Sequence, residues 1–390
     1  MYGRRHRETR RLDDGPATAT LPDVMGTLLP KLKLRTMATA LAVFGLVGLS
    51  ACGERDRVPV DASVDAAADA TADVGAPDAG SDGGTTTEPC SERDPRAMAP
   101  EAFVGPTGLA ARLVAFFDGA TSTLRVAAYE LDDPRLVSAL EAAHGRGVDV
   151  RVMVDEDREA NTGPVATLRS AGLDVRFGPA SFEHYHPKVI VADEARAIVM
   201  SANLNTYSMD TERNHGVVLD DDFDVADLVE VFDHDYEARP GDPAAAMCTR
   251  LVLSPHNARA RILSLIASAE TRLRVQQLSL TDSEVRRAIG LRAMAGVETR
   301  VILADPAWIT SNDEARAALV AMGVDVRILV TPENHAKLIV ADNAMAFVGS
   351  ENLSWTSLER NREVGVVVTA EATVAPLAAA FETDWANAAP

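Results

Sequence analysis

The chain has 390 residues, of which 47% are hydrophobic and 25% charged, and its formal net charge is −20. This length allows one large or two medium domains. Residues 91–390 alone carry 28 basic and 45 acidic side chains, a formal charge of −17, and contain no basic run. This balance disfavours a protein that binds nucleic acid through a broad basic surface, although a local positive site remains compatible with it.

The N-terminal segment, residues 1–52, has the features of an export signal. An apolar run, residues 37–51, ends in Leu-Ser-Ala-Cys and follows three basic residues, Lys31, Lys33 and Arg35. A basic start, a short apolar core and small residues before a cleavage point are typical of secretory signals. The run is shorter than the roughly 20 residues that a transmembrane helix needs. Its end resembles the bacterial lipoprotein signal, in which Cys52 is lipidated.

Residues 53–97 are predicted to be a disordered acidic linker, because Asp, Ala, Thr and Gly dominate and large apolar residues are rare. Beyond Cys52, the chain contains Cys90 and Cys248. An even pair in an oxidising compartment favours one disulfide between them, with two free thiols as the alternative. We therefore expect an exported protein that is anchored to a bacterial membrane, on the periplasmic face or cell surface, or is secreted.

Apolar runs and amphipathic segments alternate through residues 98–239. We predict strands at 124–131, 148–154 and 173–177, and helices at 133–144 and 164–170. Continuous apolar runs at 189–192 and 338–341 are typical of strands buried on both faces. Residues 240–250 are interpreted as a linker and 251–390 as a second half. The predicted fold is α/β, with two tandem α/β sandwich halves.

Beyond residue 35 the chain has only two lysines, and each follows a histidine by two positions, in His186–Lys188 and His335–Lys337. A chain that otherwise uses arginine is expected to keep lysine where a compact ammonium is required. Each triplet is followed at equal steps by an aspartate, a serine and an asparagine. The two copies lie 149 residues apart and continue with Asp193, Ser201 and Asn203, and with Asp342, Ser350 and Asn352.

These residues resemble the phospholipase D superfamily, whose signature is HxKxxxxD followed by GSxN. The second copy, HAKLIVADNAMAFVGSEN, matches throughout, whereas the first, HPKVIVADEARAIVMSAN, has Met200 in place of glycine. The resemblance implies two halves related by a pseudo-twofold axis, with both motifs meeting in one cleft. One chain would then hold the whole site, so that an oligomer is not required.

The resemblance also implies phosphodiester chemistry with no metal and no other cofactor. One neutral imidazole would attack phosphorus, and a second, protonated imidazole would donate to the leaving alkoxide. The two lysines and two asparagines of the motifs would surround the non-bridging oxygens. We expect Asp193 and Asp342 to be structural braces, and Ser201 and Ser350 to tune phosphate binding or the intermediate.

The two copies differ after the asparagine, where the family usually has Asn-x-Glu. The second copy has Asn-Arg-Glu ending at Glu363, whereas the first, aligned as Asn-His-Gly from Asn214, lacks the carboxylate. In the family this carboxylate can come from the opposite half, so that Glu363 is expected to orient His186. We interpret His186 as the nucleophile and His335 as the general acid, and the reversed assignment stays open.

The expected function is hydrolysis of the head-group ester of glycerophospholipids through a phosphohistidine intermediate. The predicted membrane anchor and the absence of a basic run favour a phospholipid substrate. A nuclease of the same superfamily is the alternative, because fold and motif alone do not choose a diester. Head-group transfer, as in cardiolipin synthases, and a non-catalytic surface lipoprotein are weaker alternatives.

Overall fold

The computed structural model describes residues 95–241, 243 and 248–390. The predicted signal segment, Cys52, Cys90 and nearly all of the predicted linker lie outside these residues. Arg96 forms an ion pair with Asp224 and donates to the carbonyl of Val367, so that the fold includes residue 96. Cys248 is disulfide-bonded. Its pairing with Cys90 stays a prediction.

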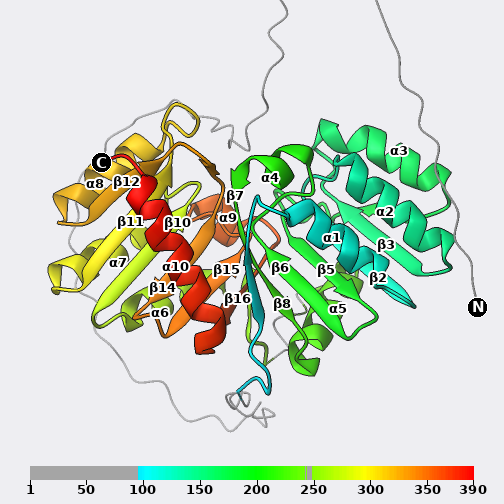
Figure 1. The fold of residues 1–390 in the computed structure, drawn as a ribbon, viewed down its shortest axis with the longest axis horizontal. Helices are drawn as coiled ribbons and strands as arrows, with labels where there is room; N and C mark the ends of the chain where they lie inside the picture. The colour runs from blue at the N-terminus through cyan, green and yellow to red at the C-terminus, as the bar shows by residue number, and fades with distance from the viewer. Residues whose placement is uncertain (1–94, 242, 244–247) are drawn as a thin grey trace, which may run out of the picture. The chain divides into compact units, whose positions relative to one another are not determined.

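Two seven-stranded mixed sheets form the framework of the described chain (Figure 1). The strand order of the first sheet is β1 (Glu101–Val104), β8 (His215–Leu219), β6 (Arg196–Met200), β5 (Lys188–Ala192), β2 (Thr123–Ala128), β3 (Asp149–Val154) and β4 (Asp174–Phe177). The order of the second is β12 (Asp325–Leu329), β11 (Glu298–Ala304), β10 (Arg272–Gln277), β14 (Lys337–Ala341), β15 (Met345–Gly349), β16 (Glu363–Val368) and β9 (Leu251–Ser254). The two sheets therefore repeat one topology, which confirms the predicted fold class of two tandem α/β halves.

Helices cover both faces of each sheet. The outer face of the first half packs against α1 (Leu109–Asp118), α2 (Pro134–Gly145) and α3 (Thr162–Ser170). That of the second half packs against α6 (Ala258–Ser268), α7 (Ser283–Met294) and α8 (Asn312–Ala321). The inner faces pack against α5 (Asp222–Tyr236) and α10 (Glu371–Asn387). A 3₁₀ turn (Glu159–Asn161) precedes α3, and two short helices, α4 (Thr206–Asp210) and α9 (Trp355–Glu359), follow the two Ser-x-Asn segments.

Local sequence explains where the repeated helices begin. Asp133 accepts hydrogen bonds from the backbone N–H groups of Arg135 and Leu136 and so caps α2. Asp282, which lies 149 residues later, caps α7 in the same way. The helix predicted at 133–144 and the strands predicted around residues 124, 148 and 173 are confirmed by α2, β2, β3 and β4.

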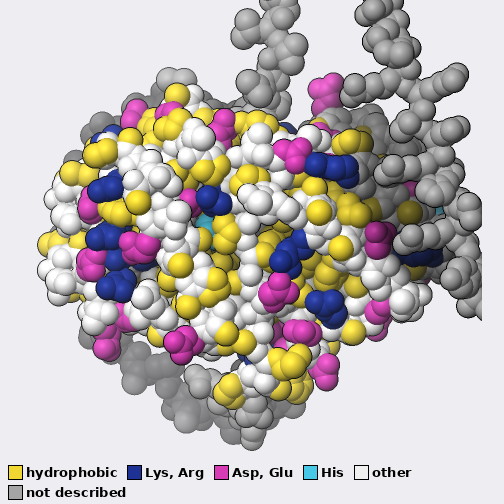
Figure 2. Space-filling model, viewed as in Figure 1, with side chains coloured by type: hydrophobic (Ala, Val, Ile, Leu, Met, Phe, Trp, Pro, Cys, Tyr) yellow, Lys and Arg dark blue, Asp and Glu magenta, His cyan; other side chains and the backbone are white. Residues whose placement is uncertain are grey.

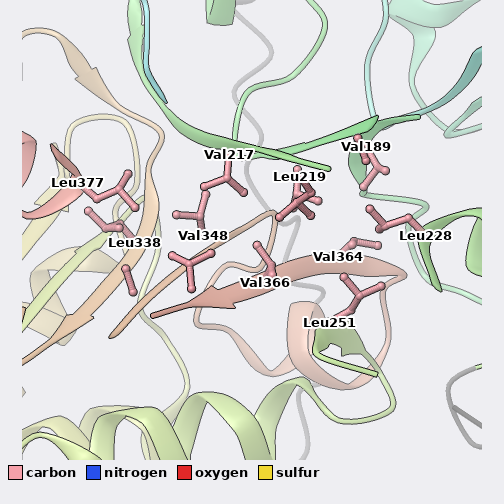
Figure 3. Close-up of a cluster of buried hydrophobic side chains, with 14 of the residues drawn as sticks. Val189, Val217, Leu219, Leu228, Leu251, Leu338, Val348, Val364, Val366 and Leu377 are labelled. Carbon is pink, nitrogen blue, oxygen red and sulfur yellow. The ribbon is translucent and has the colours of Figure 1, made fainter. Parts of the chain in front are cut away.

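One apolar cluster joins the two halves. It contains side chains from the inner faces of both sheets together with the apolar stripes of α5 and α10. Figure 3 shows Val217 and Leu219 of the first half facing Val348, Val364 and Val366 of the second. Burial of this shared core stabilises the pair of halves as one unit, because each inner face completes its apolar contacts with side chains of the other half.

Among the described helices, none is both long enough and apolar enough to cross a bilayer. On the face shown in Figure 2, acidic and basic side chains of the described residues are intermixed, and no continuous basic area covers that face.

Candidate active site

At each motif histidine, backbone hydrogen bonds join one half of the protein to the other; we call these two joints the crossings. The His186 N–H donates to the carbonyl of Arg362 at 2.9 Å, and the His335 N–H donates to the carbonyl of Arg213 at 3.1 Å. The second crossing continues as a short parallel ladder between β7 (Glu212–Arg213) and β13 (Glu333–Asn334). Each histidine is thereby placed beside the segment that follows the Ser-x-Asn motif of the opposite half.

Two ion pairs, one buried and one partly exposed, hold these paired segments in place. Arg362 makes two 2.8 Å hydrogen bonds to Asp235 on α5, and both side chains are 1% exposed. Arg213 pairs at 2.8 Å with Asp384 on α10. Each arginine thus ties the end of one half to a helix of the other half. A planar guanidinium suits the two-point contact that Arg362 makes with its carboxylate, whereas Arg213 contacts Asp384 through Nε alone.

Glu363 is the partner of His186. The His186 Nδ1 atom lies 2.6 Å from Glu363 Oε2, and both side chains are buried. Ser357 Oγ and Asn361 Nδ2 donate to the other carboxylate oxygen at 2.7 and 3.0 Å and so fix its orientation. Burial raises the pKa of Glu363 to about 7. A proton on Nδ1 that is donated to this carboxylate leaves the Nε2 lone pair of His186 available for attack.

Asn214 is the nearest partner of His335. The His335 Nδ1 atom lies 3.0 Å from Asn214 Oδ1, which also accepts a 2.8 Å hydrogen bond from Ser201 Oγ. Because an amide oxygen only accepts, the His335 Nδ1–H must be the donor in this contact. The carboxylate of Glu212 lies farther away, at 3.7 Å from the same nitrogen, and is bonded to Ser208. The two histidines therefore have different partners, a carboxylate for His186 and an amide for His335.

This geometry corrects the sequence alignment of the first half, in which no carboxylate was expected. The step of 149 residues pairs Asn214 with Glu363 and Glu212 with Asn361. The first half therefore reads Glu-Arg-Asn where the second reads Asn-Arg-Glu, and the Asn-His-Gly alignment was displaced by two residues. Applying the repeat step to Glu363 was the signal that could have found Asn214.

Both motif lysines are fully buried beside the imidazoles. Lys188 Nζ donates to the His186 carbonyl at 2.8 Å, and Lys337 Nζ donates to the His335 carbonyl at 3.0 Å. Lys337 Nζ also lies 3.1 Å from His335 Nε2. Two ammonium groups in a buried site provide the positive charge that an anionic phosphate requires.

The same environment favours neutral imidazoles. Burial, followed by the charges of Lys188 and Lys337, lowers the pKa of His186 well below its usual value. Burial, followed by the same two lysines and then by His186, lowers the pKa of His335 in the same direction. A bound anion would offset the lysine charges and raise both pKa values.

Asp193 and Asp342 lie in turns that connect strands. Asp193 accepts hydrogen bonds from the backbone N–H groups of residues 121, 122 and 123, and Asp342 from those of residues 270, 271 and 272. Although burial alone would raise it, these N–H groups hold the pKa of Asp342 to about 2 and that of Asp193 well below its usual range. Both aspartates therefore brace turns, and their hydrogen bonds go to the turns and not to the motif imidazoles.

The remaining motif residues follow β6 and β15. Ser201 and Ser350 are fully buried, and their hydroxyls accept hydrogen bonds from the backbone N–H groups of His215 and Val364 on the neighbouring strands. They therefore secure the ends of these strands. Asn203 is buried in the loop before α4, and Asn352 is half-buried in the corresponding loop before α9.

Each motif histidine also contacts an aromatic ring that the sequence did not single out for the site. The Tyr129 ring packs edge-on against His186, with 4.4 Å between centroids, and lies 5.1 Å from Lys188 Nζ. The Trp308 ring is stacked near His335 at 6.5 Å. These rings restrict the orientation of both imidazoles.

Among the described residues, one group has ligand atoms close enough together for a metal ion. Asp155, Asp157 and His184 offer atoms that all lie within 4.8 Å of one another. Asp155 is buried and accepts hydrogen bonds from the Tyr185 and Asp157 N–H groups. This group contains no residue of the two motifs.

A family model described as "Cardiolipin synthase, PLD-like domain" matches residues 113–236 and, a second time, residues 262–385. The two matches cover more than half of the chain, one in each half. The chain belongs to this family of phospholipase D-like domains.

Curated relatives agree with this membership. The mitochondrial cardiolipin hydrolase of Mus musculus is 30% identical over 127 residues, which are 32% of this chain and 57% of that protein. Phospholipase D Y of Dictyostelium discoideum is 32% identical over 101 residues, 24% of this chain and 23% of that protein. The chain spans about half the length of the cardiolipin hydrolases that it matches.

Two solved structures share the duplicated fold. Phosphatidylserine synthase of Haemophilus influenzae has a TM-score of 0.58 at 13% identity, over 75% of this chain and 86% of that one. Polyphosphate kinase of Porphyromonas gingivalis has a TM-score of 0.59 at 18% identity, over 74% of this chain and 47% of that one. At these identities the likeness shows the fold alone.

Proposed function

We propose that this protein is a phosphodiesterase that hydrolyses the head-group ester of glycerophospholipids through a phosphohistidine intermediate. The observation that carries the proposal is the asymmetric pair of buried histidines, in which His186 contacts a carboxylate and His335 an amide, between two buried lysines. A nucleophile and a general acid need opposite protonation states, and unlike partners distinguish them.

In the first step, Nε2 of His186 attacks phosphorus, a P–N bond forms and the P–O bond to the head group breaks. The His335 imidazolium gives its proton to the leaving alkoxide, while Glu363 stabilises the positive charge that develops on His186. In the second step, His335 takes a proton from water, a P–O bond forms and the P–N bond breaks. Phosphatidate and the free enzyme result. The two lysines and two motif asparagines would hold the non-bridging oxygens throughout.

Family membership and named relatives support a lipid substrate. The family description names cardiolipin synthase, and the curated relatives include cardiolipin hydrolases. The negative charge of the folded part and the intermixed charges in Figure 2 do not favour a polyanion such as nucleic acid. Export and lipidation of Cys52 would hold the enzyme close to its substrate, and they remain part of the proposal.

The test uses the full chain, purified in detergent and mixed with vesicles that contain cardiolipin, phosphatidylethanolamine and phosphatidylglycerol. Excess chelator is present, because the proposed site needs no metal. Phosphatidate and the released head-group alcohols are quantified by mass spectrometry for the wild type, His186→Ala and His335→Ala. His256→Ala is the matched control, since this histidine is exposed.

We expect phosphatidate from the wild type and from His256→Ala, and a loss of at least about 10²-fold in His186→Ala and His335→Ala. Full activity in both active-site variants would refute the two-histidine mechanism. Cleavage of DNA or RNA, with no lipid turnover by folded protein, would replace the lipid substrate by nucleic acid.

A further inference from the structure

The second motif contains a buried carboxyl group that the proposed reaction does not use. Glu351, between Ser350 and Asn352, is 0% exposed. Among the described residues, neither of its carboxyl oxygens has a hydrogen-bond partner. An ionised carboxylate here would have no water, and only the backbone N–H groups of Ser350 and Glu351, which make no hydrogen bond of normal geometry to it, would oppose the cost of burying its charge.

The sequence provides space for this carboxyl group. Gly349 and Gly365 lie opposite each other on β15 and β16. A Cβ atom would lie 2.3 Å from Glu351 Oε2 if added to Gly349, and 2.7 Å from it if added to Gly365. In the first half, the repeat step pairs Gly349 with Met200 and Glu351 with Ala202. The methionine that departs from the family signature therefore occurs where the carboxyl group is absent.

The charged groups that act on Glu351 are Glu363 on β16 and Lys188 on β5. Burial, followed by the negative charge of Glu363, raises the pKa of Glu351 well above its usual value, while the backbone N–H groups of Glu351 and Ser350 and the charge of Lys188 oppose this rise. Glu363 already accepts hydrogen bonds from its own donors and contacts His186. Two buried carboxyl groups with one ammonium nearby retain a proton between them.

We propose that Glu351 is a positioning residue that retains a proton beside Glu363, so that Glu363 remains the single anion of this pair and the partner of His186. This inference rests on the proposed function for its effect on catalysis. Loss of the Glu351 proton would add a second negative charge beside the site. That charge would favour protonation of His186, which removes the nucleophile, and would weaken the attraction of the lysines for a phosphate.

Two measurements test the protonation without any turnover. Infrared difference spectra of the full chain at about pH 8, above the pKa of about 7 of Glu363, should show a C=O band of a protonated carboxyl group that the wild type has and Glu351→Gln has lost. Thermal unfolding gives the second readout. Since the folded pKa of Glu351 is raised, the wild type loses stability as pH rises from the unfolded value toward the folded one. The Tm of Glu351→Gln relative to the wild type should therefore increase with pH, whereas Glu371→Gln, an exposed control, should give a constant difference.

The third measurement concerns catalysis. The ratio of kcat/KM for Glu351→Gln to that for the wild type should rise with pH, by up to about tenfold per pH unit above the folded pKa, because only the wild type can gain the extra charge. A purely structural role would give a ratio that is independent of pH.

The outcomes separate the two proposals. Absence of the carboxyl band together with a pH-independent Tm difference would show that Glu351 is ionised and would overturn this inference, whatever the enzyme turns over. The band and the Tm trend with a flat activity ratio would overturn the catalytic effect. The band and the Tm trend in a protein that releases no phosphatidate would refute the proposed function and leave the proton on Glu351 established.

Discussion

The two histidines have different partners, a carboxylate and an amide, and the role of each partner can be tested by exchanging it. Glu363→Gln removes the negative charge beside His186, and Asn214→Asp adds one beside His335. The contact that is lost in the first variant is a 2.6 Å charge-assisted hydrogen bond between side chains that are 6% and 0% exposed. Such a bond contributes about 1.5–3 kcal/mol. We therefore expect kcat/KM of Glu363→Gln to fall about 10- to 150-fold.

Asn214→Asp should act on pH dependence. The new carboxylate would lie about 3.0 Å from His335 Nδ1, the distance of the present amide oxygen. An opposite charge at this distance raises the pKa of an imidazole by about 1–3 units. The general acid would then keep its proton to higher pH, and the alkaline limb of the profile should move up by about that amount. Glu212, which is already 3.7 Å from the same nitrogen, reduces the gain because the two carboxylates repel each other.

The assay measures kcat/KM from about pH 5 to 10 for the two variants and the wild type, with phosphatidate release as the readout. An activated p-nitrophenyl phosphodiester serves as a second substrate, since its leaving group needs little protonation. Glu363→Gln should be slow with both substrates, because attack is impaired. If Glu363→Gln kept the wild-type rate while Asn214→Asp lost activity at every pH with the activated substrate, His335 would be the nucleophile and the assignment would be wrong.

Three further predictions concern charge, packing and the joint between the halves. Lys188→Arg should lower kcat/KM by at least about 100-fold, because a planar guanidinium cannot direct a compact charge at the phosphate oxygens as an ammonium does; a wild-type rate would contradict this. Gly349→Ala should destabilise the protein by about 1–3 kcal/mol in urea unfolding, since its Cβ would lie 2.5 Å from the Cα of the opposite strand. Gly163→Ala, whose Cβ would meet nothing within 4 Å, is the control and should not destabilise it. Arg362→Met should cost about 3–5 kcal/mol because it leaves Asp235 buried without its cation, and Asp235→Leu in the same chain should recover part of that loss.

Local patterns predicted the elements and the repeat. The strand expected at 189–192 makes up all of β5 except its first residue, and its counterpart at 338–341 does the same in β14; the residues of both strands are all buried. Hydrophobic runs and capping aspartates act over a few residues, so they can be read from the sequence directly. The equal steps between motif residues revealed the duplication, because the two halves keep the same strand and loop lengths between these residues.

The partner of His335 could not be read in the same way, whereas Glu363 was expected beside His186 from the family resemblance and lies there. The contact between His335 and Asn214 spans 121 residues and depends on the register of the crossing between β7 and β13. The sequence alignment was displaced by two residues, so that it paired Glu363 with Gly216 instead of Asn214 and left Glu212 out of the site. Nothing local marks the correct register, since it is set by pairing between segments that are distant in the chain. The fit between Glu351 and its two glycines is hidden for the same reason.

The exchange of Glu and Asn shows how a duplicated site can become asymmetric without a change in its histidines or lysines. Each half keeps one carboxylate and one amide in the three-residue segment after the motif, and in each half a serine hydroxyl bonds to the carboxylate, Ser208 to Glu212 and Ser357 to Glu363. The halves differ in which group contacts the imidazole of the opposite half: the carboxylate of Glu363 contacts His186, and the amide of Asn214 contacts His335. The carboxylate oxygen lies 2.6 Å from one Nδ1 atom and 3.7 Å from the other. Because the strength of a charge-assisted hydrogen bond depends on direct contact, this shift of two residues gives one imidazole an anionic partner and leaves the other with a neutral one. A symmetric pair would have to break its symmetry with each substrate, whereas this pair begins with its two histidines already distinguished.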